Sequence, residues 1–269
     1  MDTAQAIESL LASQPLALAT DFDGTISQIA PTPEGAVVHP DCREWLSRLS
    51  EILPLVAIIS GRPAEDVHRL VDLDSVVYVG NHGLETWKSG QTRVEPSASK
   101  QVEHIRRIAA AAHRVLTTPG MVFEDKGTAY AVHYRQAPRP ELAGEEAAAL
   151  LRKLAAGTGV KVIEGRRVVE LRPDLEIDKG TALFDLLSRH HLGSATYAGD
   201  DLTDADAFAG LRRWASAGHR ASVTVGIRST EMPERLREDA DLILADVEAW
   251  ADFLEQLVRA LDAGRPSGG

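Results

Sequence analysis

Residues 16–27 read LALATDFDGTIS, and this stretch gives the first indication of the fold class. A run of apolar and small residues stops abruptly at two aspartates, Asp21 and Asp23, with Gly24 and Thr25 directly behind them. A short apolar run without polar alternation is typical of a parallel strand that helices cover on both faces. Because ligands of open parallel sheets bind beyond the carboxyl ends of the strands, the two carboxylates lie where a binding site is expected.

Further runs of the same kind recur along the chain, at residues 53–59, 75–80, 194–199, 222–227 and 241–245. Helical patterns separate most of them, and strand–helix alternation predicts an open α/β sheet with right-handed crossovers. A hairpin is expected where ETWKSGQTRV turns at Ser89 and Gly90.

The middle of the chain follows a different pattern. Two helices, at about 100–116 and 141–156, are each followed by two short strands, MVFED and TAYAVHYR after the first, VKVIEG and RRVVELR after the second. This αββαββ order predicts a separate α+β unit. The expected fold class is therefore α/β: a Rossmann-like parallel-sheet core formed by residues 1–99 and 173–269, with an inserted smaller cap domain at 100–172.

Composition excludes several classes of protein. The 269 residues carry a formal net charge of −11, which disfavours nucleic acid and anionic membranes as partners. No apolar run approaches the roughly 18 residues of a membrane-spanning helix, and the acidic N-terminal segment predicts a short helix rather than a signal peptide. The single cysteine, Cys42, allows no intrachain disulfide and suits the cytoplasm. We expect a cytoplasmic monomer that binds neither nucleic acid nor membranes.

Polar and charged residues follow four of the predicted strands. The first strand leads into Asp21 and Asp23, and later strands lead into SGR (60–62), NHG (81–83) and GDDLTD (199–204). Since the strand ends meet at one edge of a parallel sheet, these side chains are expected to converge. Buried carboxylates repel one another unless a cation lies between them, and oxygen ligands favour a hard ion such as Mg²⁺.

This set of side chains suits phosphoryl transfer. A carboxylate next to the metal ion can attack phosphorus to form an aspartyl-phosphate, and a second carboxylate two residues on can protonate the leaving oxygen and then deprotonate water. Ser60 can donate a hydrogen bond to a phosphoryl oxygen, and Lys179 adds positive charge at the start of a helix. Each motif alone is also compatible with a turn, a helix cap or a solvated side chain, but four such strand ends in one sheet favour a site.

The order of these motifs resembles the haloacid dehalogenase-like (HAD) superfamily of aspartate-nucleophile phosphatases. DFDGT (21–25) matches its first motif, Ser60 the second, Lys179 the third and GDD (199–201) the fourth, and the insertion resembles its C2-type cap. A narrower resemblance is to the trehalose-6-phosphate phosphatase family. It is carried by DFDGTISQIAPTPEGA, SGR, VGNHGLE, FEDKGTAYAVHYR, VVELRP, DKGTAL and GDDLTDADAF.

The resemblance implies a role for each core residue. Asp21 is expected to be the nucleophile and Asp23 the general acid/base, with Mg²⁺ on the Asp21 carboxylate, the Asp23 backbone carbonyl and Asp200. The residues expected to hold the phosphoryl group are Thr25, Ser60 and Lys179. The residues expected to support the metal and Lys179 are Asp201 and Asp204. The residues expected to border the sugar phosphate are Arg62 and Asn81.

Charged residues of the insertion are candidates for sugar recognition. Glu124 and Lys126 are two residues apart, the spacing that gives side chains on one face of a strand, and the same periodicity places Arg166 and Glu170 on one face of their strand. Charged groups form strong hydrogen bonds with sugar hydroxyls. The resemblance implies the same four residues, although Arg166 stands where the family often has lysine, a point charge rather than a planar fork. A cross-strand salt-bridge ladder on a solvated face is the alternative. Two more residues, His133 and Arg135, are compatible with either role: they contact the sugar, or they only support the sheet.

The favoured hypothesis is a Mg²⁺-dependent phosphomonoester hydrolase of trehalose biosynthesis that converts trehalose 6-phosphate to trehalose and phosphate. The alternatives are the same fold acting on another sugar phosphate, such as sucrose phosphate or glucosylglycerol phosphate, a phosphotransferase, and a catalytically silent sensor of sugar phosphates. An intact set of Asp21, Asp23, Lys179 and Asp200 argues against a silent sensor, since a pure binder needs neither a nucleophile nor an acid. Closure of the cap over the core is expected to complete the site.

Overall fold

The computed structural model describes residues 1–30, 35–165, 167–229 and 232–264. The chain forms two compact units, which we call the core unit (Met1–Thr92 and Ile177–Gly269) and the inserted unit (Arg93–Glu176). The predicted insertion at 100–172 falls inside the inserted unit, and its function as a cap stays a prediction.

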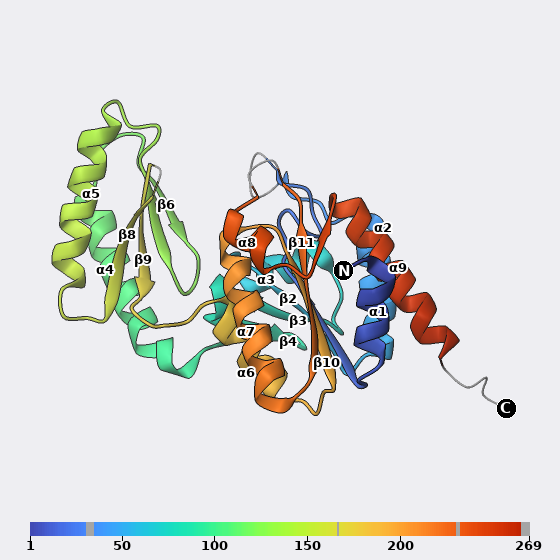
Figure 1. Ribbon diagram of the computed structural model, residues 1–269. Coiled ribbons are helices and arrows are strands. Elements are labelled where there is room, and N and C mark those ends of the chain that lie inside the picture. Colours follow the sequence, from blue (N-terminus) through green and yellow to red (C-terminus); the bar gives the residue numbers. More distant parts are fainter. Residues whose placement is uncertain (31–34, 166, 230–231, 265–269) are drawn as a thin grey trace. The chain divides into compact units, whose positions relative to one another are not determined.

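An eight-stranded sheet runs through the core unit in the order β12-β11-β10-β1-β2-β3-β4-β5 (Figure 1). Neighbouring strands are parallel from β12 to β3, and β4 pairs antiparallel with β3. The strands are β1 (Leu16–Thr20), β2 (Leu55–Ile59), β3 (Val77–Gly80), β4 (Glu85–Lys88), β5 (Gln91–Val94), β10 (Ser194–Gly199), β11 (Ala221–Ile227) and β12 (Leu242–Leu244). The predicted parallel-sheet core is confirmed, and the predicted hairpin turns at Ser89 and Gly90, which both have positive φ.

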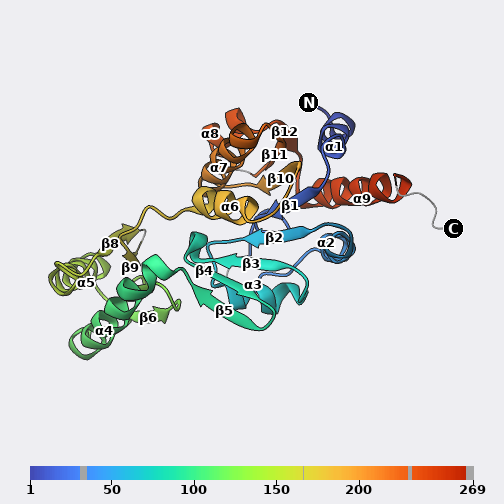
Figure 2. The same ribbon diagram turned by 90° about the horizontal axis from the view of Figure 1, so that it is seen from below.

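Helices cover both faces of this sheet (Figure 2). One layer consists of α1 (Thr3–Leu11), α2 (Pro40–Ile52), α3 (Ala64–Val71) and α9 (Val247–Ala263). The other layer consists of α6 (Lys179–Ser188), α7 (Leu202–Gly218) and α8 (Glu234–Asp239). A single turn of 3₁₀ helix, η2 (Asn81–Gly83), follows β3.

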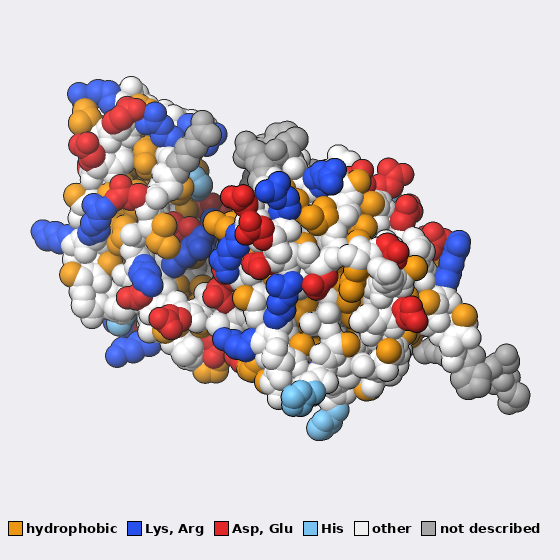
Figure 3. Space-filling model, viewed as in Figure 1, with side chains coloured by type: hydrophobic (Ala, Val, Ile, Leu, Met, Phe, Trp, Pro, Cys, Tyr) orange, Lys and Arg blue, Asp and Glu red, His pale blue; other side chains and the backbone are white. Residues whose placement is uncertain are grey.

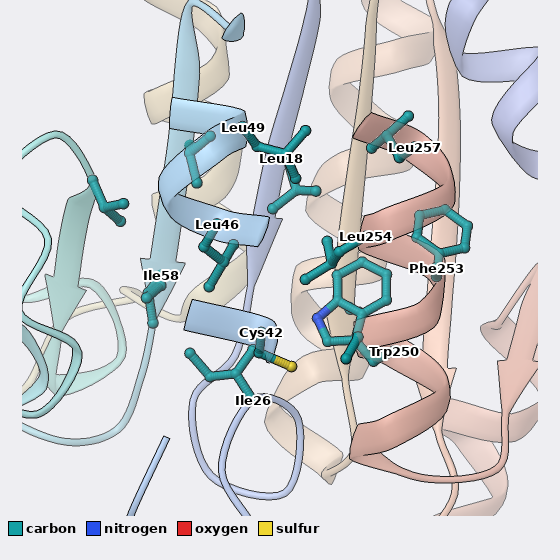
Figure 4. Packing of buried hydrophobic residues seen from close by; sticks show 14 of the residues in the cluster. Leu18, Ile26, Cys42, Leu46, Leu49, Ile58, Trp250, Phe253, Leu254 and Leu257 are labelled. Carbon is teal, nitrogen blue, oxygen red and sulfur yellow. The ribbon is translucent and has the colours of Figure 1, made fainter. Parts of the chain in front are cut away.

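Strand β1 contributes side chains to both layers. Leu16 and Leu18 belong to the cluster with α1, α2, α3 and α9, whereas Ala17 and Ala19 belong to the cluster with α6, α7 and α8. Figure 4 shows Leu18 among the leucines of α2 and α9. This two-sided burial explains why the run has no polar alternation, and each buried leucine contributes about 1.5–3 kcal/mol. The strand therefore holds the aspartate that follows it in a defined place.

The inserted unit contains a four-stranded antiparallel sheet in the order β6-β7-β9-β8. Its elements are η3 (Pro96–Ala98), α4 (Ser99–Val115), β6 (Val122–Asp125), β7 (Tyr130–His133), α5 (Pro140–Ala155), β8 (Val160–Gly165) and β9 (Val168–Pro173). Helices α4 and α5 pack on the sheet through an apolar cluster that they share with β7 and β9. The predicted αββαββ order is confirmed, but β7 is shorter than TAYAVHYR because a turn at Gly127 (φ +76°) precedes it and a turn after His133 ends it.

The surface and the single cysteine agree with the composition. Basic and acidic side chains are interspersed on the face of each unit that Figure 3 shows. Among the described residues, no helix is both long enough and apolar enough to cross a membrane. Cys42 is a free, buried thiol, and burial raises its pKa to about 12, so it is a packing residue rather than a reactive one.

Candidate active site

Asp21 and Lys179 lie at the centre of the cluster beyond the strand ends of the core unit. The backbone N–H of Asp21 donates to the carbonyl of Ala198 (2.8 Å), so Asp21 continues the pairing of β1 with β10. Lys179 is the first residue of α6, which begins with a capping box. Its Nζ lies 3.0 Å from Asp21 Oδ1 and 2.8 Å from Asp204 Oδ1. The start of this helix thus brings positive charge to the end of β1.

Burial controls the protonation of these three side chains. It raises the pKa of Asp21 well above the ordinary range, and the positive charge of Lys179 offsets this only in part. Burial likewise raises the pKa of Asp204. Burial also disfavours the charge on Lys179, but the carboxylates of Asp204 and Asp21 outweigh it and raise the pKa of the ammonium group. Lys179 is therefore a permanent cation, whereas the carboxylates need further positive charge to stay ionised.

A second group of carboxylates lies where β10 meets α7. Asp201 caps this helix, since its Oδ1 accepts the backbone N–H groups of Thr203 (2.8 Å) and Asp204 (3.1 Å). Oδ2 of Asp204 accepts the backbone N–H groups of Asp200 (2.9 Å) and Asp201 (3.0 Å). Oδ1 of Asp200 is buried and has no hydrogen-bond partner among the residues that the structure describes. Burial, together with the neighbouring carboxylates, raises the pKa of Asp200 to about 7.

This donor set fits a divalent metal ion. Carboxylate oxygens of Asp21, Asp200 and Asp204 lie within 4.8 Å of one another, and hard cations prefer such oxygen ligands. Asp204 already accepts four hydrogen bonds, from Lys179, from Tyr197 and from two backbone amides. Asp21 and Asp200 therefore have the greater capacity to bind an ion, and Asp204 serves to hold Lys179.

Gly24 lets the turn after β1 pass directly beside Asp200. Its φ is +77°, in the left-handed region that favours glycine, and a Cβ atom there would overlap all three atoms of the Asp200 carboxyl group. The N–H of Gly24 donates to the carbonyl of Ser27 (2.7 Å) and closes the turn. The turn buries Thr25, whose Oγ1 has no hydrogen-bond partner in the described part of the chain. Thr25 can therefore donate its hydroxyl to a bound ligand.

Asp23 is held by Arg62 in a two-point ion pair. Nε of Arg62 donates to Asp23 Oδ2 (2.6 Å), and Nη2 donates to Oδ1 (2.7 Å). The guanidinium carbon lies 5.3 Å from the centroid of the Phe22 ring, and the backbone N–H of Arg62 donates to Ser60 Oγ (3.2 Å). A bidentate pair of this kind fixes the plane of the carboxylate. Arg62, which was expected to border a sugar phosphate, thus contacts the expected acid/base.

The loop after β3 braces the loop after β2. The backbone N–H of Asn81 donates to the carbonyl of Arg62 (2.8 Å), and that of His82 donates to the carbonyl of Ser60 (3.0 Å). The buried carboxylate of Glu85 accepts the first backbone N–H of α3 (2.8 Å) and a hydrogen bond from Asn81. Glu85 therefore ties the loop after β3 to the start of α3, the helix that follows the loop after β2.

In the inserted unit, Glu170 is the centre of a cluster of charged side chains. It pairs with Lys126 (3.2 Å) and Arg172 (2.8 Å), Lys126 lies 3.8 Å from Glu124, and Glu124 contacts His133 Nε2 (2.8 Å). Burial opposes the ionisation of Glu170, but its two cationic partners outweigh it and lower the pKa. Glu124 and Glu170 both pair with the same residue of β7, so they share one face of the sheet. These contacts form the cross-strand ladder that was the alternative interpretation, and sugar binding by the same residues stays a prediction.

The structure brings the predicted core residues to one edge of the sheet, and Arg166 lies outside the described residues. Arg135 and His133 line a cavity of about 340 Å³ in the inserted unit. Sequence reasoning missed Glu85 and Tyr197. An acidic residue directly after NHGL was a usable signal for Glu85. Tyr197 lies in an apolar run, where an aromatic residue ordinarily indicates core packing.

Comparison with known proteins adds independent information. The family model described as trehalose-phosphatase matches residues 19–242. A trehalose-phosphate phosphatase of Mycobacterium tuberculosis is 39% identical over 217 residues, which cover 77% of this chain and 54% of that protein. The chain thus spans about half the length of this curated relative. Two solved structures share its fold at 21% identity. A trehalose-6-phosphate phosphatase related protein has a TM-score of 0.71 (93% of this chain, 100% of that one). The C-terminal domain of the Candida albicans trehalose-6-phosphate phosphatase has a TM-score of 0.68 (96% and 97%).

Proposed function

The chain belongs to the trehalose-phosphatase family, and we propose that it is a metal-dependent phosphomonoester hydrolase that converts trehalose 6-phosphate to trehalose and phosphate in trehalose biosynthesis. The observation that carries this proposal is the buried contact of Asp21 with Lys179 beside the unpartnered oxygen of Asp200. A buried carboxylate held by a cation suits nucleophilic attack on phosphorus, whereas a sensor needs no such group. The name of the mycobacterial relative supports the choice of substrate.

In the proposed reaction, a carboxylate oxygen of Asp21 attacks phosphorus in line with the sugar oxygen. The bond from phosphorus to the sugar oxygen breaks, and Asp23 gives its proton to that oxygen as trehalose leaves. Asp23 then takes a proton from water, and the water oxygen attacks phosphorus. The bond from phosphorus to the Asp21 oxygen breaks, which releases phosphate and restores the Asp21 carboxylate. The bidentate contact with Arg62 orients the ionised carboxylate of Asp23, and one of its two hydrogen bonds must open for an oxygen of Asp23 to carry the proton that it gives to the sugar oxygen.

Three side chains are proposed to hold the phosphoryl oxygens: Thr25, Ser60 and Lys179. The buried hydroxyl of Thr25 supports this role, because it has no partner within the described residues. A divalent ion, which we propose to be Mg²⁺, would be held by Asp21, Asp200 and the backbone carbonyl of Asp23. When bound, it neutralises the charge between the attacking carboxylate and the phosphoryl group. Asp201 supports this arrangement as the cap of α7, and Asp204 supports it by holding Lys179.

The inserted unit is proposed to be the cap that recognises the sugar, through Glu124, Lys126 and Glu170. Charged groups that are already oriented by ion pairs form strong hydrogen bonds with hydroxyls, and such a site rejects analogues that lack the matching hydroxyl. We further propose that the protein acts as a cytoplasmic monomer, in keeping with its formal net charge of −11 and its single cysteine.

The test is phosphate release from trehalose 6-phosphate, with Mg²⁺ or with EDTA, for the unmodified protein and two variants. Asp21→Asn is expected to lose about a thousandfold or more of the activity, and EDTA is expected to abolish it. Asp185→Asn is the matched control, because Asp185 is an exposed aspartate on α6. Activity that survives in Asp21→Asn would refute the assignment of Asp21 as the nucleophile. Full activity in EDTA would refute the requirement for a metal ion. Faster hydrolysis of sucrose phosphate than of trehalose 6-phosphate would refute the substrate.

A further inference from the structure

Tyr197 completes the hydrogen-bonding shell of Asp204. The tyrosine lies on β10, its side chain is fully buried, and its Oη donates to Asp204 Oδ1 (2.7 Å). The same oxygen accepts a hydrogen bond from Lys179 Nζ (2.8 Å), while Oδ2 accepts the backbone N–H groups of Asp200 (2.9 Å) and Asp201 (3.0 Å). Each oxygen of this carboxylate thus has two donors, which fix its rotation.

We propose that Tyr197 is a positioning residue of the site: its hydroxyl orients Asp204 so that Lys179 is directed at Asp21. Lysine is a flexible chain that ends in a point charge, so its direction is set by the groups that its ammonium contacts. With Tyr197 on Oδ1, the ammonium shares that oxygen and also reaches Asp21 Oδ1 (3.0 Å). Without the hydroxyl, the two backbone amides still hold Oδ2, but Oδ1 keeps only Lys179 of the two donors described above, so the ammonium can move toward Oδ1 and away from Asp21. This inference rests on the proposed function of the site.

The surroundings of Tyr197 support an orienting role. Burial, and next to it the negative charge of Asp204, raises the pKa of Tyr197 well above the ordinary range. The phenol is therefore a neutral donor, and it cannot compete with Asp204 for Lys179 as a phenolate. Its ring also meets Phe208 edge-to-face at 6.2 Å, so packing fixes the direction of the hydroxyl.

The chain contains a matched control for the loss of this hydroxyl. Tyr78 on β3 is equally buried, and its Oη donates to the carbonyl of Leu73 (2.8 Å). Tyr78→Phe therefore removes the same hydroxyl from a side chain that is also fully buried. In both variants the former acceptor keeps another donor: the backbone N–H of Val76 for the Leu73 carbonyl, and Lys179 for Asp204 Oδ1. A merely structural role predicts that both variants lose similar thermal stability and that neither changes the turnover number.

The experiment compares Tyr197→Phe with Tyr78→Phe for kcat, KM and Tm, on trehalose 6-phosphate and on p-nitrophenyl phosphate. We expect Tyr197→Phe to lower kcat about 3- to 30-fold on both substrates with KM unchanged, and Tyr78→Phe to leave both constants unchanged. Equal kcat values in the two variants would overturn the proposal, as would a loss that appears in KM alone.

A second readout keeps this test separate from the test of the proposed function. Activity on p-nitrophenyl phosphate alone would refute the sugar substrate, and the kcat comparison would then be made on that compound. If the protein proves inert on both compounds, the readout is the NMR signal of the buried Lys179 ammonium, assigned by its loss in Lys179→Arg. The signal should shift and exchange faster with water in Tyr197→Phe and not in Tyr78→Phe. An unchanged signal in Tyr197→Phe would overturn the proposal.

Discussion

Replacing Gly24 by alanine should damage the site far more than the fold. The new Cβ atom would overlap the whole carboxyl group of Asp200, closer than the 3.0 Å that real Cβ atoms keep, so that group must withdraw by on the order of 1 Å. A misplacement of this size costs roughly 100-fold in turnover. We therefore expect Gly24→Ala to lower kcat about 100-fold and to raise the Mg²⁺ concentration needed for half-maximal activity.

Gly90→Ala separates this steric effect from backbone strain. Gly90 has nearly the same φ, +80° against +77° for Gly24, but nothing lies within 4 Å of the place that a Cβ atom would take there. Alanine in this conformation costs about 1–2 kcal/mol at either site, which lowers Tm by roughly 2–8 °C. The assay is phosphate release over a range of Mg²⁺ concentrations, with Tm measured in parallel. If Gly24→Ala keeps kcat within about threefold of Gly90→Ala, the reasoning about Asp200 is refuted.

Three further predictions concern single side chains. Burial raises the pKa of Asp200 from 3.8 to about 7, so the folded chain binds this proton more tightly than the unfolded chain, and metal-free protein should lose stability as the pH rises from about 4 to about 7. Tm measured over this pH range should show the dependence in EDTA and not in Mg²⁺. Arg62→Lys keeps the charge but loses the two-point hold on Asp23. Its kcat should fall about tenfold or more on trehalose 6-phosphate and less on p-nitrophenyl phosphate, whose leaving group needs no proton. Glu170→Gln should reduce kcat/KM about tenfold or more on trehalose 6-phosphate and leave p-nitrophenyl phosphate unaffected.

Each of these predictions has a control in the same chain. Asp200→Asn should weaken the pH dependence without abolishing it, because burial also raises the pKa values of Asp21 and Asp204. An unchanged dependence in this variant would assign it to those two groups. Arg43→Lys changes an arginine of α2 whose guanidinium contacts Asp72, the residue after α3, and should leave turnover unchanged. The control for Glu170→Gln is Glu164→Gln, which removes a negative charge from β8. Glu164 pairs with Arg152 and does not belong to the cluster around Glu170. Equal losses in Glu164→Gln and Glu170→Gln, or equal losses of Glu170→Gln on both substrates, would contradict sugar recognition.

The elements of the fold and the place of the site could be predicted from residue patterns alone. Whether a segment is a buried strand or a helix depends on local periodicity, and LALAT carries that information without its neighbours. Because parallel strands point the same way, residues that directly follow them must meet at one edge, so Asp21, Ser60 and Asp200 could be assigned to one cluster. The insertion could be recognised for the same reason, since its pattern of helices and strands differs from that of the core.

The pairing of the charged side chains could be read only from the folded chain. Asp23 contacts Arg62 from 39 residues away, and Lys179 contacts Asp204 from 25 residues away. No periodicity encodes such distances, because they depend on the order of strands in the sheet and on the turns between them. The three carboxylates near Lys179 look alike in sequence, yet hydrogen bonds satisfy both oxygens of Asp204 and leave one oxygen of Asp200 without a partner in the described chain. That difference arises from burial and donor geometry, and the hydroxyl of Tyr197 became part of the site in the same way.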